Sequence, residues 1–465
     1  MLILAPTSDE SGALIYGYMS QPNRFSWGLL VGLSALSIQA SGQNPIIRDQ
    51  FSADPTARVF GNKIYLFPSH DILATQGKGR VGWFCMEDYH VFSSTNLMDW
   101  DDHGLVVSQT TVPWTDPAGY SMWAPDCIER KGKYYFYFPA APKGGRGFSI
   151  GVAIANKPEG PYIPEPQPIK NVRGIDPNVF IDRDGQGYLY WAGGNFYGAK
   201  LKDNMVELAS DPVLLKDFPS KGLKEGPFLF ERNGTYYMTY PHVDKVTERL
   251  EYAMAKSPLG PFTYAGVLMD EIPGCWTNHQ SVVQYKNQWY LFYHHNDYSP
   301  DFDKARSVRV DTINFNPDGT IQKVVPTLRG VGTMPADRQI KIDRYSKISQ
   351  KGVSIAFLDG TNTFKGWKTT FTGAGSWLEY DRVDFGLRRF GKLSVKARSA
   401  QGSALQFHAD SADGPMIAEV SIPGGDSGSE LTVPVQAKQR GVHNLFVVAK
   451  GDGPVDVEWV RFQSH

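Results

Sequence analysis

Residues 175–194 read IDPNVFIDRDGQGYLYWAGG, and the same pattern occurs four more times along the chain. Each copy has a polar residue at or beside a proline, an apolar run, a turn containing Gly or Asn, and an aromatic strand. The other copies are ADPTARVFGNKIYLFPSHD from Ala53, WAPDCIERKGKYYFYFPA from Trp123, KEGPFLFERNGTYYMTYP from Lys224 and NHQSVVQYKNQWYLFYHHN from Asn278. The prolines at 55, 125, 177 and 227, with Ser281 in the fifth copy, are separated by steps of 70, 52, 50 and 54 residues. Repeats of this length with several short strands are typical of β-propeller blades.

The repeat predicts an all-β chain in which residues 44–332 form a five-bladed β-propeller. Helical repeats are excluded, because the copies contain strand runs with tight turns instead of apolar residues at a helical spacing. After Gly332 the aromatic repeats stop. Residues 337–465 contain short strands such as WLEYDRVDF and HNLFVVA, in which apolar and polar residues alternate. We predict that this segment is a separate β-sandwich of the jelly-roll type.

The composition excludes several classes of protein. The 465 residues include 47 Lys and Arg against 48 Asp and Glu, so nucleic acid is not an expected partner. Aromatic residues make up 13% of the chain, which argues against disorder and a coiled coil. Cys85, Cys127 and Cys275 are too few and too widely spaced for a disulfide framework or a zinc site. We expect buried cysteines with at most one disulfide, and the sequence says nothing about the oligomeric state.

The N-terminal segment resembles an export signal. Residues 25–40 read FSWGLLVGLSALSIQA and follow Arg24. This apolar run is too short to cross a bilayer comfortably, and it fits a secretory signal that is cleaved near residue 42. We therefore predict that residues 1–42 are a signal peptide with an extension ahead of a true start at Met19. The mature protein is expected to be secreted or periplasmic and free of the membrane; the alternative is a buried or membrane-tethering helix.

The pseudo-symmetry predicts that polar residues from different blades meet at one end of the central channel. Asp54, Trp123, Asp176, Glu225 and His279 all stand where the first strand of their copy begins. Carboxylates brought together in a poorly solvated pocket raise the pKa of at least one of them. Glycosidic bond cleavage needs such a set: one acid protonates the leaving oxygen, one carboxylate activates water, and a third tunes the acid.

Four further assignments stay open at the level of sequence. Trp123 is either a core residue or a platform that stacks on a sugar ring. His279 either satisfies buried backbone groups or belongs to the site. Asp71 lies in a rim loop or contacts substrate. Arg306 and Arg309, in ARSVRVDTINF, are expected on the same side of their strand, where either could reach a rim carboxylate.

These motifs together resemble glycoside hydrolase family 43. The resemblance rests on ADPTARVF, GIDPNVFID, KEGPFLF and WAPDC, and on the HHNDYSP and RSVRVDTINFNPDGTIQ stretches, over roughly residues 44–330. It implies an O-glycosyl hydrolase that acts with inversion on xylan- or arabinan-derived glycans, so a plant polysaccharide or oligosaccharide is the expected partner. Sucrose- and fructan-cleaving propellers carry different motifs where this chain has SADPTA, GIDPNV and KEGPF. A retaining fructosidase is therefore not expected.

The resemblance also implies roles for individual residues. Asp54 would be the general base, Glu225 the general acid, and Asp176 the residue that orients the acid and tunes its pKa. Arg306 would lie near the sugar subsite. His279 would contact a structural calcium ion through water at the propeller centre, and no cofactor would be required for the chemistry. For inversion, the carboxyl groups of Asp54 and Glu225 are expected about 6.5–9.5 Å apart.

The C-terminal segment resembles a family 6 carbohydrate-binding module. IKIDRYSKIS, GSWLEYDRVDFG and GVHNLFVVAKGDGPVDVEWVRF match its opening, second and last strands. The loop PGGDSGSELTVPV lacks the exposed Trp that is usual there, and Lys341 replaces an acidic residue that helps to bind calcium. Trp377 and Trp459 are expected in the core. A stabilising or substrate-framing role is therefore predicted for this module.

Three hypotheses about function remain at this point. The first is an inverting hydrolase that releases xylose or arabinofuranose units, as a β-xylosidase or α-L-arabinofuranosidase. The second is an endo-arabinanase, which needs an open groove instead of a pocket. The third is a non-catalytic carbohydrate-binding propeller, which would tolerate the loss of one carboxylate, whereas all three carboxylates are present here.

Overall fold

The computed structural model describes residues 43–464 apart from positions 220, 388, 426 and 438. These residues form thirty β-strands and one short 3₁₀ helix. In the part of the chain that is described, no helix has the length and apolarity needed to cross a membrane. The predicted signal peptide lies outside the described residues.

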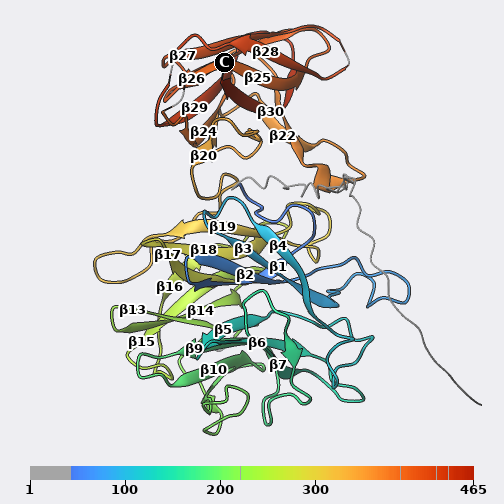
Figure 1. Ribbon diagram of the computed structural model, residues 1–465, viewed down its shortest axis with the longest axis vertical. Helices are drawn as coiled ribbons and strands as arrows, with labels where there is room; N and C mark the ends of the chain where they lie inside the picture. Colours follow the sequence, from blue (N-terminus) through green and yellow to red (C-terminus); the bar gives the residue numbers. More distant parts are fainter. Residues whose placement is uncertain (1–42, 220, 388, 426, 438, 465) are drawn as a thin grey trace, which may run out of the picture. The chain divides into compact units, whose positions relative to one another are not determined.

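The first five sheets are the blades of the predicted propeller (Figure 1). Blade one contains β1 (Ala53–Phe60), β2 (Lys63–Ser69), β3 (Asp88–Ser94) and β4 (Asp101–Ser108). Blade two contains β5 (Asp126–Arg130), β6 (Lys133–Ala140), β7 (Ser149–Ala155) and β8 (Ile163–Pro164). Blade three contains β9 (Ile175–Ile181), β10 (Gly187–Ala192), β11 (Phe196–Lys200) and β12 (Val213–Leu214). Blade four contains β13 (Phe228–Arg232), β14 (Thr235–Val243), β15 (Glu248–Ala255) and β16 (Thr263–Met269), and blade five contains β17 (Ser281–Tyr285), β18 (Gln288–His295) and β19 (Ser307–Ile313).

Within each blade, antiparallel strands follow one another in chain order. The aromatic run of each repeat is the second strand, and its side chains pack against the neighbouring blade. For example, Phe67 of β2 and Phe136 of β6 lie in one buried cluster, with ring centroids 5.9 Å apart. The turn from β1 to β2 contains Gly61 at φ 62°, a left-handed conformation that glycine adopts at little steric cost. The aromatic excess of the sequence therefore serves mainly to join blades.

The ring closes between the first and last blades. Leu66 and Phe92 of blade one share a buried cluster with Phe292 and Val308 of blade five. Ser281, which replaces the proline of the other copies, accepts a hydrogen bond from the Ala57 N–H at 2.9 Å. The departure from the repeat thus stands at the point where the first and fifth blades meet.

The C-terminal segment forms a β-sandwich with two sheets. One sheet contains β20 (Met334–Pro335), β21 (Lys347–Ile348), β24 (Trp377–Asp384), β26 (Ser403–Ala409), β27 (Met416–Ile422) and β29 (Val442–Ala449). The other contains β22 (Val353–Phe357), β23 (Trp367–Phe371), β25 (Phe390–Arg398), β28 (Ser429–Pro434) and β30 (Val455–Ser464), and the helix η1 (Thr363–Lys365) lies between β22 and β23 in sequence.

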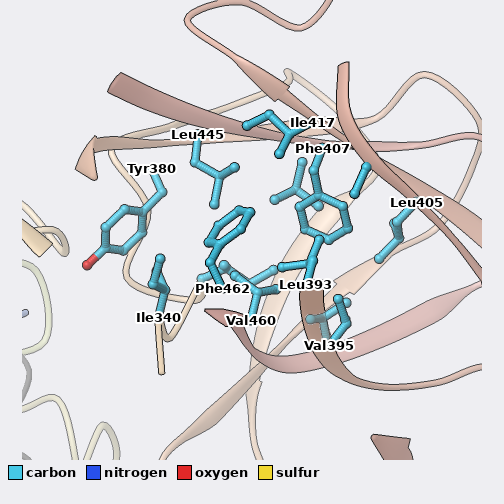
Figure 2. Packing of buried hydrophobic residues seen from close by; sticks show 14 of the residues in the cluster. Ile340, Tyr380, Leu393, Val395, Leu405, Phe407, Ile417, Leu445, Val460 and Phe462 are labelled. Atoms are coloured by element: carbon cyan, nitrogen blue, oxygen red, sulfur yellow. The ribbon is translucent and has the colours of Figure 1, made fainter. Parts of the chain in front are cut away.

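The sandwich core lies between these two sheets. Figure 2 shows Phe407 and Leu445 of one sheet facing Leu393 and Phe462 of the other. The strands alternate as the sequence indicates, since every second residue of β23 is buried. Trp459 is buried on β30, but Trp377 is only half-buried, and neither belongs to the core cluster, so the expectation that both lie in the core is wrong. The all-β class and the order of propeller and sandwich are therefore confirmed.

Candidate active site

A pocket of about 210 Å³ is lined by residues from all five blades. The structure brings together six of the seven predicted site residues, namely Asp54, Trp123, Asp176, Glu225, His279 and Arg306. The repeat accounts for five of these, because each stands at or just before the first strand of its blade. The seventh, Asp71, is buried and does not line the pocket.

Asp54 and Asp176 enter the pocket from matching β-bulges. Between Ala53 and Thr56, the register of β1 against β2 shifts by one residue, and β9 shifts in the same way against β10. Asp54 has φ 45° and Asp176 has φ 55°, in the left-handed region that non-glycine residues rarely occupy. Bulges redirect side chains, and a strained backbone of this kind is found at functional sites. The Asp-Pro dipeptides of the two blades thus build one local structure twice.

Asp54 is held as a carboxylate. Arg306 donates to it from both terminal nitrogens, at 2.8 and 3.1 Å, and Ser69 Oγ donates at 2.7 Å. Burial alone would raise the pKa of Asp54, but the charge of the Arg306 guanidinium and the hydrogen bond from Ser69 help to lower it to about 2. The Asp54 N–H also donates to His294 Nδ1 at 3.2 Å, while His294 Nε2 donates to the Thr277 carbonyl at 2.9 Å. This carboxylate is therefore both ionised and fixed in place.

Asp71 stands behind Arg306 instead of in the pocket. It accepts hydrogen bonds from the Arg306 N–H, Nε and Nη2 at 2.8–2.9 Å. Because Asp71 is 1% exposed, the geometry makes it a partner of Arg306 and leaves it no direct access to a substrate.

Arg306 and Arg309 point to different places, so the expectation that they share a side is wrong. Arg309 binds Asp297, with Nε 2.8 Å from Oδ2, and does not line the pocket. The reason is that side chains alternate along a strand with a period of two, so residues three apart face opposite sides. Arg306 is therefore the arginine of the site.

Glu225 has a raised pKa. It is partly exposed to the pocket, and burial together with the charge of Asp54 raises its pKa to about 7. Asp176 Oδ2 accepts the N–H of the following residue, Gly226, at 2.9 Å and so fixes the backbone beside Glu225. Gly226 has φ 55°, and a Cβ there would lie 2.8 Å from Pro241. Burial, and next the charge of Glu225, raise the pKa of Asp176 well above its usual range.

Glu248, on β15, is a buried carboxyl that sequence reasoning missed. It is 1% exposed, and Oε2 accepts the Asn278 N–H at 2.7 Å. Burial and the neighbouring Glu225 raise its pKa well above the usual range, so it is protonated and donates to Glu225. Glu248 stands on the third strand of blade four, where the repeat predicts no site residue. Its only signal in the sequence is a charge within the apolar strand ERLEYAMA.

Aromatic side chains make up much of the rest of the pocket. Trp83 and Phe84 come from the long connection between β2 and β3, and Trp276 precedes β17. The rings of Phe84 and Trp276 are stacked, with centroids 6.1 Å apart, and the Arg306 guanidinium lies 4.9 Å from the Phe84 centroid. Of these aromatic residues, sequence reasoning found only Trp123, because the others lie in connections outside the repeat.

His279 lies beside the general-base candidate, with Nδ1 3.8 Å from Asp54 Oδ1. Burial lowers the pKa of His279 to about 4, and this lowering outweighs the opposing effect of Asp54. The ring is therefore neutral and can accept a hydrogen bond from a water molecule. The next residue contributes a buried side-chain oxygen, Gln280 Oε1, that has no hydrogen-bond partner among the described residues. Oxygen ligands and bound water suit calcium, so these groups fit the ion that the resemblance implies.

Comparison with known proteins identifies the catalytic part of the chain. Residues 42–321, more than half of the chain, match the model for glycosyl hydrolases family 43. The chain belongs to this family. Residues 346–464 match the model for the carbohydrate binding module (family 6). This member of family 43 is therefore an O-glycosyl hydrolase with an attached module.

Three relatives illustrate the similarity. The family 43 chain is 36% identical over 326 residues to "Xylosidase/arabinosidase 43A" of Humicola insolens. The alignment covers 60% of this chain and 98% of that protein. It is 28% identical over 477 residues to an arabinoxylan arabinofuranohydrolase of Bacillus subtilis, covering 88% and 90% of the two chains. A solved family 43 β-xylosidase/α-arabinofuranosidase from a compost microbial metagenome, with xylotriose bound and calcium absent, has a TM-score of 0.55 and 32% identity over 61% of this chain and 98% of that one.

Proposed function

We propose that this family 43 enzyme releases single xylose or arabinofuranose units, with inversion, from plant hemicellulose or its oligosaccharides. One observation carries the proposal: a single small pocket contains an ionised carboxylate, Asp54, and a carboxyl with a pKa of about 7, Glu225. An inverting glycosidase needs this pair of charge states at neutral or mildly acidic pH. The activities for which the xylosidase and arabinofuranohydrolase relatives are named support the choice of sugar.

In the proposed reaction, Glu225 protonates the leaving oxygen of the glycosidic bond. Asp54 removes a proton from a water molecule, which attacks the anomeric carbon from the opposite face. Asp176 takes no proton from the substrate; it holds Gly226 and thereby the acid. Arg306 keeps Asp54 ionised and fixes the orientation of the two Asp54 carboxylate oxygens. The required separation between the two reacting carboxyl groups is about 6.5–9.5 Å.

The pocket favours removal of terminal units over cleavage within a polymer. Its volume of about 210 Å³ suits one small ring, and Trp83, Trp123 and Trp276 offer apolar faces on which a pentose can stack. An endo-acting enzyme would need space for sugars on both sides of the cleaved bond. We therefore place exo action ahead of endo-arabinanase action.

We also propose that a calcium ion at the channel axis is held through water by His279. The neutral ring and the unpartnered Gln280 Oε1 support this assignment. The ion would contribute positive charge and order beside Asp54, and the proton transfers themselves belong to Asp54 and Glu225. Addition of calcium to chelator-treated enzyme should raise the melting temperature, and His279→Ala should abolish that increase.

Secretion completes the proposal, because an enzyme that acts on plant polysaccharide must meet a substrate outside the cell. Residues 25–40 have the character of an export signal. N-terminal sequencing of the exported protein should find a start near residue 42, and a mature product that retains residues 25–40 would contradict this part of the proposal.

Glu225→Gln tests the central assignment. Glutamine keeps the size of the side chain but cannot donate the proton, so turnover on natural xylosides and arabinofuranosides should fall by about 10²–10⁴-fold. Aryl glycosides with good leaving groups should lose much less, since they need little protonation. The matched control is Glu231→Gln near the end of β13, where Glu231 binds Arg183 and does not line the pocket. Unchanged turnover in Glu225→Gln, or retention of the anomeric configuration in early products followed by NMR, would contradict the mechanism.

A further inference from the structure

A second group of polar side chains lies on blade one, away from the lining of the pocket. His70 follows β2, and Asp88 and His90 stand on β3. Residues two apart on a strand face the same side, so Asp88 and His90 point together. One potential ligand atom from each of the three residues lies within 4.8 Å of the others. We call these three residues the histidine cluster.

The members of the histidine cluster are neither fully buried nor fully exposed. The side chains of His70, Asp88 and His90 are 20%, 13% and 20% exposed. An ion can therefore reach them from solvent, and a water molecule can complete its coordination. The two rings meet edge to face, with centroids 5.3 Å apart, so both imidazoles border the same small volume.

The hydrogen bonds of the histidine cluster leave ring nitrogen atoms available to bind a metal ion. His90 Nδ1 lies 3.1 Å from Asp102 Oδ2 on β4, and Nε2 of that ring has no hydrogen-bond partner among the residues that the structure describes. A carboxylate behind one nitrogen of a histidine fixes the ring and makes the other nitrogen a better ligand, as in many metal sites. His70 Nδ1 lies 2.7 Å from Asp88 Oδ1, and the two atoms share a hydrogen bond. A metal ion could replace the shared proton and bind both atoms.

The donor set selects the class of ion. Two imidazoles and one carboxylate suit Zn²⁺ or a similar transition-metal ion, which binds such atoms at about 2.0–2.2 Å and accepts water as a fourth ligand. Calcium and magnesium prefer oxygen ligands throughout. The histidine cluster therefore differs in chemistry from the water-mediated calcium proposed at His279.

We propose that His70, Asp88 and His90 bind one Zn²⁺-class ion, with Asp102 orienting His90. The inference stands on the geometry of blade one and does not depend on the proposed function. The ion would join the end of β2 to β3. The residue after His70 is Asp71, which binds Arg306, and Arg306 in turn binds Asp54. By fixing His70, the ion would therefore help to hold Asp71 in position against Arg306.

Zinc titration of the full chain tests the proposal. The protein is treated with a chelator, desalted and titrated with zinc chloride in a calorimeter. We expect one equivalent to bind, and a rise in melting temperature at saturation, because an ion that binds only the folded state stabilises it. His90→Gln and His70→Gln should each weaken binding at least tenfold, and Asp102→Asn about 10–100-fold through loss of the supporting carboxylate.

Two controls separate this site from other ligands in the chain. His443→Gln removes a half-buried histidine of the sandwich that is paired with Asp410 at 2.8 Å, and this variant should bind zinc as the unchanged protein does. With Co²⁺ in place of zinc, the visible absorption bands of the bound ion should disappear in His90→Gln and persist in His443→Gln. Three results would overturn the proposal: no stoichiometric site, zinc affinity in His90→Gln and His70→Gln equal to that of the unaltered protein, or loss of binding only in His279→Ala.

Discussion

Blade one and blade three present the same motif to the pocket but hold it in opposite charge states. Asp54 and Asp176 both precede a proline, both lie in a β-bulge, and both have a left-handed backbone. Burial raises the pKa of both side chains to begin with. The pKa of Asp54 nevertheless falls to about 2, whereas that of Asp176 rises well above its usual range.

The difference comes from the neighbours of each carboxyl. Asp54 receives two hydrogen bonds from the Arg306 guanidinium. Asp176 has Glu225 as its strongest charged neighbour and receives a neutral backbone N–H from Gly226. The repeat thus positions the carboxyls, and side chains from other blades decide which of them is ionised. One local structure thus holds one carboxyl ionised and the other neutral.

Asp54→Asn should reduce activity more than any other substitution considered below. Asparagine keeps the shape of the side chain but cannot take a proton from water, so kcat should fall by about 10²–10⁴-fold on aryl xylosides and arabinofuranosides. The matched control is Asp203→Asn on blade three, where Asp203 is exposed and binds Arg130. Added azide offers a second readout, because a small external nucleophile can replace the activated water. An Asp54→Asn variant with near-normal turnover would remove Asp54 from the mechanism.

Asp176→Asn should cost far less, because asparagine resembles the protonated form of Asp176. Its amide oxygen can still accept the Gly226 N–H, and the expected decrease in kcat is about tenfold, equivalent to about 1.4 kcal/mol. Asp176→Ala, which removes the acceptor, should lower kcat further. A loss in Asp176→Asn as large as that in Asp54→Asn would mean that Asp176 acts as an ionised carboxylate, against the direction of its pKa.

The sequence predicts the architecture and the carboxyls for the same reason. A repeat of 50–70 residues determines both the number of blades and the equivalence of Asp54, Asp176 and Glu225. Trp83 and Phe84 could not be predicted in this way, since they lie in a connection between β2 and β3 that has no counterpart in the repeat. Glu248 could not be predicted as a site residue either. Its partner, Glu225, lies before the first strand of the blade, and only the fold brings the two side chains together.

Arg306→Lys should move the pKa of Asp54 toward that of Asp176. A lysine keeps the charge but not the paired hydrogen bonds, so the pKa of Asp54 should rise by about one unit. Because the proposed base Asp54 acts in its ionised form, the acid limb of kcat/KM should move upward by the same amount, and activity should disappear at a higher pH during acidification. Arg309→Lys, three residues along the chain, alters the pair with Asp297 and should leave this limb in place.

Glu248 should have the smallest effect, confined to the alkaline side of the pH profile. In the proposed mechanism Glu225 acts in its protonated form, so kcat/KM should fall as the pH rises through about 7. The Glu248 carboxyl donates to Glu225 and thereby favours its ionised form. Glu248→Leu removes the donor and should move the alkaline limb upward by about one unit or less, whereas Glu248→Gln retains an N–H donor and should leave it nearly unchanged. A purely structural residue would lower the melting temperature in both variants without moving the limb, so the difference between leucine and glutamine isolates the hydrogen bond.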